Sequence, residues 1–131
     1  MTKYKNILLV DDDIDDRMLF EQILGEMDPD ITLQVAENGS EMVSLLDRSP
    51  DAALPELIIL DQNMPKMTGK ESLIYLKDSD RYRKIPVILY STYQMKDFFL
   101  ECRQLGVLDV VSKPDTIQSY REMIGQLIVP A

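Results

Sequence analysis

The chain has 131 residues, of which 45% are apolar, and its formal net charge is −9. A chain of this length is expected to fold as one domain, and its acidic balance argues against nucleic acid as a partner, because nucleic-acid recognition relies on basic patches. Histidine is absent from the sequence, which excludes a His-based catalytic triad and a zinc site with His ligands.

Neither membrane insertion nor a secretory signal peptide is expected. The longest apolar runs are far shorter than the roughly 20 residues that a membrane-spanning helix requires, and residues 1–6 lead directly into a strand pattern. The single cysteine, Cys102, excludes an internal disulfide and fits a reducing cytoplasm. We interpret Cys102 as a small buried apolar residue of a helix.

Strand and helix patterns alternate along the chain. Short runs rich in Ile, Leu and Val are typical of buried parallel strands, and five are predicted: Asn6–Val10, Ile31–Val35, Leu57–Leu60, Val87–Tyr90 and Val107–Val111. Helical spacing predicts five helices. Three have predicted bounds: 15–27, about 94–105 with Gly106 at its end, and 116–128. The other two begin at a cap formed by Ser40 and after Gly69. These five units predict a doubly wound α/β domain with a parallel sheet.

Apolar spacing also predicts which side of a helix faces the core. For the first helix this side comprises Met18, Leu19, Ile23, Leu24 and Met27, and for the last helix Ile117, Tyr120, Ile124 and Leu127. The segment 48–55 contains two prolines and is predicted to be a loop.

Three acidic residues and a lysine follow the ends of predicted strands. Asp11 and Asp12 come after the first strand, Asp61 after the third and Lys113 after the fifth. Ligands of parallel sheets bind at the carboxyl ends of the strands, so these side chains are expected to converge at one edge. Gathered carboxylates need a cation to be stable, and the pattern therefore favours a metal-dependent phosphoryl site.

With these residues, the chain resembles the receiver domain of two-component response regulators. The resemblance rests on four segments, 9–13, 60–69, 86–91 and 112–114, each at or next to the end of a strand. It covers the whole chain, which we interpret as a single receiver domain over 1–131. It implies the flavodoxin-like fold, with a five-stranded parallel sheet in the order 2-1-3-4-5 and helices on both faces.

The resemblance implies that Asp61 is the phosphoacceptor, whose carboxylate attacks the phosphoryl group of a phosphohistidine. Asp11, Asp12 and Asp61 would hold Mg²⁺ together with the backbone carbonyl of Asn63, because Mg²⁺ prefers oxygen ligands and retains several waters. Lys113 would pair with a phosphoryl oxygen.

Two further residues complete the expected site. Ser91 matches the position whose hydroxyl donates a hydrogen bond to the phosphoryl group. The Lys113–Pro114 bond is usually cis in this family, which would aim the lysine into the site. We interpret Asp13, Asp15 and Asp16 as acidic residues in or before the first turn of a helix, where the helix macrodipole favours negative charge, and not as metal ligands.

The chain departs from the family at Val110, where receiver domains commonly have Tyr or Phe. A small branched residue cannot act as a bulky two-state rotamer, so the usual aromatic readout is not expected. Tyr90 and Tyr93 flank Ser91, and either could serve in place of the missing aromatic residue, although ordinary packing explains Tyr90 equally well. Tyr93, with Asn63, borders the path of the hydrolytic water, and we expect it to lengthen the lifetime of the phosphoryl group.

The implied function is that of a stand-alone response regulator receiver. It would accept phosphate from a sensor histidine kinase or a histidine phosphotransfer protein, and signal through a downstream protein target, through a homodimer or by passing phosphate onward. It would not be an enzyme beyond catalysing its own phosphorylation and dephosphorylation.

Three alternatives remain open at this stage. A phosphorylation-independent interaction module is favoured by Val110. A phosphohydrolase with an aspartyl-phosphate intermediate usually has an acid two residues after the nucleophile, where this chain has Asn63. A flavin-binding flavodoxin requires a phosphate loop after the first strand, where this chain has aspartates.

Overall fold

A computed structural model of the chain describes residues 4–64, 67–91 and 96–128, with Ser91 described through its backbone. Within these residues, five parallel strands form one sheet in the order β2-β1-β3-β4-β5. The strands are β1 (Asn6–Val10), β2 (Thr32–Ala36), β3 (Leu57–Asp61), β4 (Val87–Ser91) and β5 (Asp109–Ser112). The predicted sheet and strand order are confirmed.

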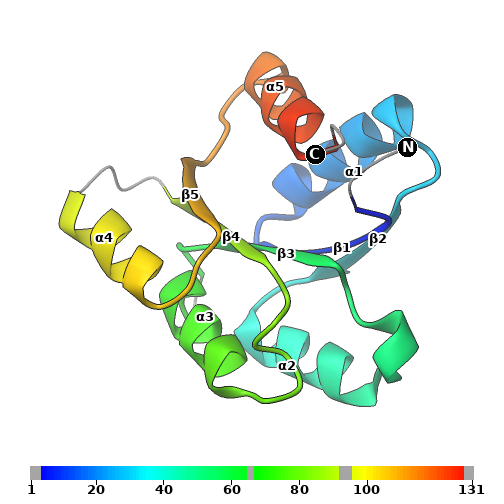
Figure 1. Cartoon of the computed structure of the whole chain (residues 1–131). Coiled ribbons are helices and arrows are strands. Elements are labelled where there is room, and N and C mark those ends of the chain that lie inside the picture. The colour runs from blue at the N-terminus through cyan, green and yellow to red at the C-terminus, as the bar shows by residue number, and fades with distance from the viewer. Residues whose placement is uncertain (1–3, 65–66, 92–95, 129–131) are drawn as a thin grey trace.

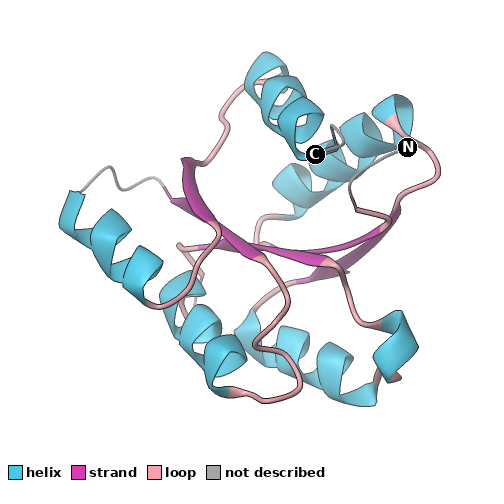
Figure 2. Ribbon diagram, in the orientation of Figure 1, coloured by secondary structure: helices cyan, strands magenta, loops and turns pink. Residues whose placement is uncertain are grey.

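Helices cover both faces of this sheet, as predicted (Figures 1 and 2). The helices are α1 (Ile14–Met27), α2 (Gly39–Arg48), α3 (Gly69–Asp78), α4 (Lys96–Gln104) and α5 (Ile117–Ile128). In Figure 1, α1 and α5 lie on one face, while α2, α3 and α4 lie on the other. None of the helices in the described residues is long and apolar enough to cross a membrane.

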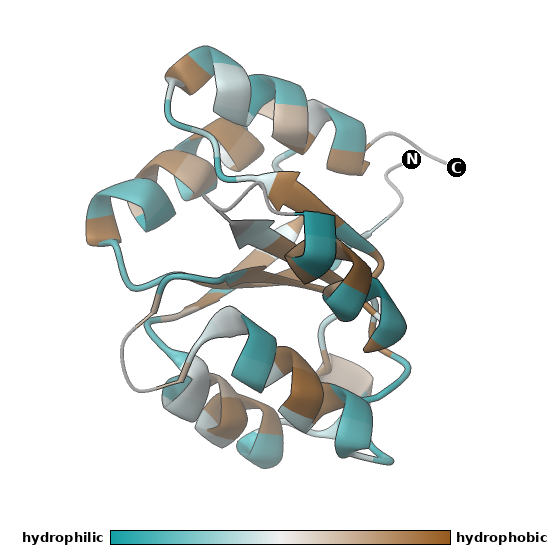
Figure 3. Ribbon diagram, turned by 90° about the vertical axis from the view of Figure 1, so that its left-hand side faces the viewer, coloured by the Kyte–Doolittle hydropathy of each residue, from teal (hydrophilic) through white to brown (hydrophobic). Residues whose placement is uncertain are grey.

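The alternation of side chains along each strand divides the core into two layers. In β1, Ile7 and Leu9 pack toward α1 and α5, whereas Leu8 and Val10 pack toward α2 and α3, and all four are fully buried. Figure 3 shows the largely apolar strands of the sheet between helices in which apolar and polar residues alternate. Each such side chain contributes roughly 1.5–3 kcal/mol through burial, which explains why the strand runs are continuously apolar.

Helices α1 and α2 begin at side chains that accept the free N–H groups of the first turn. Asp13 Oδ1 accepts hydrogen bonds from the backbone N–H groups of Asp15 (2.9 Å) and Asp16 (3.2 Å) at the start of α1. The predicted cap of α2 is wrong by two residues, because Asn38 and not Ser40 accepts the N–H of Glu41, at 2.8 Å. A side-chain oxygen at the cap is worth about 1 kcal/mol, so these residues fix where each helix begins.

The predicted inner face of α1 needs correction. Phe20 is fully buried, whereas Met18 is 61% exposed. Two residues correspond to about 200° of rotation around an α-helix, so burying Phe20 turns Met18 toward solvent. In α5 the prediction holds for Tyr120 and Ile124, but Ile117 opens the helix and is 57% exposed, outside both core clusters.

The remaining differences concern the ends of elements. The predicted loop 48–55 contains a 3₁₀ turn, Asp51–Ala53. β5 begins two residues later than predicted, because Val107 packs in the core beside α4 before the strand starts. Gly106 ends the turn after α4 with a φ of 95°, a backbone conformation that favours glycine.

Gly69 lets the first turn of α3 approach the end of β3 closely. A Cβ at this position would lie 2.6 Å from the carbonyl oxygen of Asp61 and 2.6 Å from Leu89 Cδ1. The Gly69 N–H also donates to the carbonyl of Gln62, at 3.3 Å. The missing side chain therefore sets the position of the backbone next to Asp61.

We expect Gly69→Ala to lower the free energy of unfolding by about 1–3 kcal/mol, because the methyl group forces the backbone or Leu89 to move. Gly25→Ala in α1 is the matched control, since a Cβ there meets nothing within 4 Å. This control should stabilise the protein by about 0.5–1 kcal/mol through helix propensity. Urea unfolding measures both changes, and equal midpoints for Gly69→Ala and the wild type would contradict the close approach.

Candidate functional site

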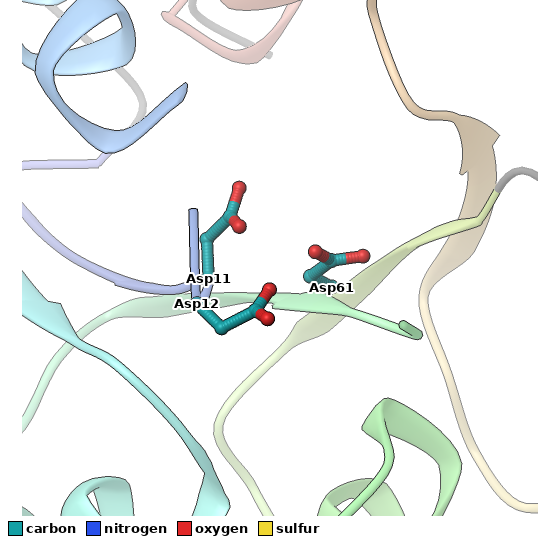
Figure 4. Close-up of side chains that lie close together, drawn as sticks. All are labelled: Asp11, Asp12 and Asp61. Carbon is teal, nitrogen blue, oxygen red and sulfur yellow. The ribbon is translucent and has the colours of Figure 1, made fainter. Parts of the chain in front are cut away.

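Three aspartates converge at the carboxyl edge of the sheet. Asp11 and Asp12 follow β1, and Asp61 is the last residue of β3, the neighbouring strand (Figure 4). One carboxylate oxygen from each lies within 4.8 Å of the others. Asp11 and Asp61 are 1% exposed, whereas Asp12 is exposed. At such separations two carboxylates repel by about 1–4 kcal/mol at effective dielectrics of 80 to 20.

Lys113 supplies the positive charge at this edge. Its Nζ lies 2.8 Å from Asp61 Oδ2, 3.0 Å from Asp16 Oδ2 and 3.3 Å from both carboxylate oxygens of Asp11. The lysine side chain is 14% exposed, and Nζ lies 6.0 Å from the centre of the Tyr90 ring. Lys113 therefore bridges the carboxylates from the β5 side of the site.

The expected cis bond before Pro114 is wrong, because the described residues contain no cis peptide bond. Lys113 nevertheless reaches the carboxylates. It directly follows β5, and its side chain lies on the side of the sheet that is turned toward α1 and α5. Val111, two residues earlier, packs in the core layer on that face.

The environment shifts the protonation of two of these groups. Burial raises the pKa of Asp11 from 3.8 to about 7, assisted by the negative charge of Asp61 and opposed by a backbone hydrogen bond from Asp13. Burial alone would lower the pKa of Lys113, but hydrogen bonds to Asp61 and Asp16 outweigh it and raise the pKa above its ordinary value. The ammonium is therefore charged at neutral pH, while Asp11 holds a proton readily when no cation is bound.

Backbone hydrogen bonds hold the two buried carboxylates in place. Asp11 Oδ1 accepts the N–H of Asp13 at 3.0 Å, and Asp61 Oδ1 accepts the N–H of Asn63 at 3.1 Å. The guanidinium of Arg17 donates to the carbonyl of Asp11 at 2.7 Å. The acids are thus fixed at the sheet edge before any ligand arrives.

The donor set fits a divalent cation. Asp11 Oδ2 is buried, and although the ammonium of Lys113 is near, this oxygen accepts no hydrogen bond from a described residue. Three carboxylates next to one ammonium leave excess negative charge, which a hard cation with oxygen ligands would neutralise. The backbone N–H of Asn63 binds Asp61, but the metal bond of its carbonyl remains a prediction.

Sequence reasoning missed two residues that support the site. Asp16 contacts Lys113 and precedes Phe20, which the structure buries, by one helical turn, so the two residues share the inward face of α1. Choosing Phe20 in place of Met18 as an inward residue was the sequence signal that would have placed Asp16 on this face. Gln62, directly after Asp61, accepts the N–H of Lys70 at 2.8 Å through its side chain. Its carbonyl accepts the N–H groups of Met64 and Gly69, so it closes the segment between β3 and α3.

Ser91, Tyr93, Val110 and Tyr90 are the remaining residues of the predicted site. Ser91 ends β4 and pairs in register with Ser112, but the placement of its side chain lies outside the described structure. Tyr93 lies outside the described residues altogether. Val110 packs against the core layer of α2, α3 and α4, and Tyr90 is fully buried in the layer of α1 and α5, beside Asp61 in register.

Comparison with known proteins gives one consistent result. The family profile described as the response regulator receiver domain matches residues 7–125. The two-component response regulator ORR5 of Oryza sativa subsp. japonica is 32% identical over 109 residues, which are 83% of this chain and 78% of ORR5. A protein-glutamate methylesterase/protein-glutamine glutaminase 2 of Carboxydothermus hydrogenoformans is 37% identical over 119 residues, and the match spans 31% of its length.

Solved structures of response regulators have the same fold. The phosphorylated cyanobacterial phytochrome response regulator RcpA superposes with a TM-score of 0.84 at 26% identity, over 95% of this chain and 91% of RcpA. The Mn²⁺-bound form of response regulator Rcp1 gives a TM-score of 0.81 at 27% identity, over 94% of this chain and 91% of Rcp1.

The raised pKa of Asp11 should make the metal-free protein less stable as the pH increases. The unfolded chain releases this proton near the ordinary pKa of 3.8, whereas the folded chain holds it to about pH 7, so folding is favoured at acidic pH and this advantage is lost as the pH rises through 7. In EDTA, we expect the free energy of unfolding to be about 2 kcal/mol larger at about pH 5 than at about pH 8.

Urea unfolding at the two pH values measures this difference. Asp11→Asn has no proton to release at this position, so its stability should change much less between the two pH values. An equal change in the wild type and in Asp11→Asn would assign the effect to other groups.

Proposed function

Because the chain belongs to the response regulator receiver domain family, we propose that it is a phosphoacceptor signalling domain. Asp61 receives the phosphoryl group from a sensor histidine kinase or a histidine phosphotransfer protein. The observation that carries the proposal is the setting of the Asp61 carboxylate, which lies at the carboxyl end of β3, 2.8 Å from Lys113 and next to Asp11 and Asp12.

In the proposed reaction an oxygen of Asp61 attacks the phosphorus atom of a phosphohistidine. A P–O bond forms, the P–N bond breaks, and the imidazole leaves with the electron pair of that bond and takes up a proton. The N–H of Asn63 orients the carboxylate by donating to Oδ1, which leaves the other oxygen directed toward Lys113. Such transfers depend mainly on positioning and on neutralising charge.

In this proposal two positive charges, the ammonium of Lys113 and a bound Mg²⁺, balance the negative charge of the transferred phosphoryl group. Lys113 pairs with a phosphoryl oxygen, and Ser91 donates its hydroxyl to another. Asp11, Asp12 and Asp61 would hold Mg²⁺ together with the carbonyl of Asn63. When bound, Mg²⁺ neutralises the negative charge that gathers on the phosphoryl oxygens.

The signal leaves through the surface near Lys113. Phosphorylation adds up to two negative charges at Asp61, and Lys113 stands on the connection between β5 and α5. A change in the contacts of this lysine biases α4, β5 and α5, and so alters binding of a downstream protein target or of a second copy of the chain. We place the protein in the cytoplasm, where thiols stay reduced, consistent with its free and buried cysteine, Cys102.

Mass spectrometry after incubation with Mg²⁺ and acetyl phosphate tests the proposal. We expect the wild type to gain one phosphoryl group and Asp61→Asn to gain none. Asp97→Asn, which changes an exposed aspartate in the first turn of α4, should react as the wild type does. Modification of Asp61→Asn to the wild-type extent would reject Asp61 as the acceptor.

A phosphorylation-independent interaction module is the alternative, and Val110 favours it because the usual aromatic switch is missing. The two functions differ in the response of the surface to a phosphoryl mimic. Addition of Mg²⁺ and beryllofluoride should shift backbone amide NMR signals of α4 and α5 if phosphorylation is read there. Shifts confined to the neighbourhood of Asp61 would support the alternative.

A further inference from the structure

One carboxylate partner of Lys113 lies outside the proposed metal site. Asp61, Asp16 and Asp11 surround its Nζ at 2.8, 3.0 and 3.3 Å. Asp11 and Asp61 belong to the group of described carboxylates that converge within 4.8 Å, and Asp16 does not. A cation held by that group would compete with Lys113 for Asp11 and Asp61, and would leave Asp16 as a partner of the ammonium.

The start of α1 fixes the position of Asp16. Asp13 accepts the N–H groups of Asp15 and Asp16, which anchors the first turn. Asp16 lies one turn before Phe20, so both are on the inward side of α1. The Asp16 side chain is 30% exposed, and it therefore binds the ammonium without the desolvation cost of full burial. Asp15 is exposed and lies beside Met18 on the outer surface of α1.

We propose that Asp16 is a positioning residue for phosphoryl transfer, which keeps the ammonium of Lys113 beside Asp61 when a cation occupies the other carboxylates. An ammonium has three N–H donors, so Lys113 can retain its bond to Asp16 while the other donors turn to the phosphoryl oxygens. A free lysine side chain has about 2 kcal/mol of rotamer entropy, and the contact with Asp16 limits the positions it samples. This inference rests on the proposed function, because it assumes a phosphoryl group at Asp61.

Binding of beryllofluoride to the Mg²⁺-saturated chain, followed by amide NMR shifts, tests the inference. Asp16→Asn should weaken binding about three- to ten-fold, the loss expected for one charge-assisted contact. Asp15→Asn is the matched control, because it removes the same charge from the same helical turn without touching Lys113, and it should stay within about two-fold of the wild type. Asp16→Glu keeps the carboxylate and should recover part of the loss.

A double-mutant cycle separates positioning from a general effect of charge. If Asp16 acts through Lys113, Asp16→Asn should have no further effect in a Lys113→Ala background. If the loss persists at full size without the lysine, Asp16 acts by another route and the inference is wrong.

The ammonium of Lys113 provides a readout that needs no phosphoryl mimic. In the Mg²⁺-loaded wild type, its ¹H–¹⁵N signal should be protected from exchange by the bond to Asp16. The signal should persist in Asp15→Asn and disappear in Asp16→Asn, while thermal melts show both variants folded. An equally protected signal in Asp16→Asn would overturn the inference.

The outcomes distinguish this inference from the proposed function. A wild-type chain that binds Mg²⁺ and beryllofluoride, together with an Asp16→Asn variant that binds them equally well, overturns the role of Asp16 alone. A wild-type chain that ignores beryllofluoride overturns the proposed function, and the role of Asp16 with it.

Discussion

The site depends on the pairing of one ammonium with carboxylates that meet at the carboxyl edge of the sheet. Lys113 contacts Asp11, Asp16 and Asp61, two of which are almost completely buried. Charges are costly to bury unless they are paired, so the lysine makes the arrangement tolerable without making it neutral. The remaining negative charge is one that a bound cation would neutralise.

The rest of the fold keeps this arrangement rigid. The cap at Asp13 fixes where α1 begins, and the Thr68 hydroxyl, which accepts the N–H of Glu71 at 3.2 Å, does the same for α3. The close approach at Gly69 joins the start of α3 to the end of β3. Gln62 closes the segment that carries Asn63. Charged groups of like sign would move apart in a flexible chain, but rigid elements hold them together here. The preorganised geometry of the site therefore lowers the stability of the fold.

Sheet topology explains how much of this could be predicted from the sequence. Parallel strands share one carboxyl edge, so the positions of Asp11, Asp61 and Lys113 after their strands were enough to predict that they meet. The contact between Asp16 and Lys113 was missed because the rotation of α1 depends on burying Phe20, and the spacing of apolar residues alone did not identify the inward face. Similarly, the sequence could not reveal which carbonyls and amides Gln62 connects, because that depends on backbone geometry between β3 and α3.

Calorimetric titration of the metal-free chain with Mg²⁺ tests the role of the acidic edge most directly. One equivalent should bind to the wild type, with an affinity that drops strongly in Asp12→Asn, which removes an exposed carboxylate of the converging group and leaves the partners of Lys113 in place. Absence of Mg²⁺ uptake by the wild type, or equal uptake by Asp12→Asn, would contradict a cation site at this edge.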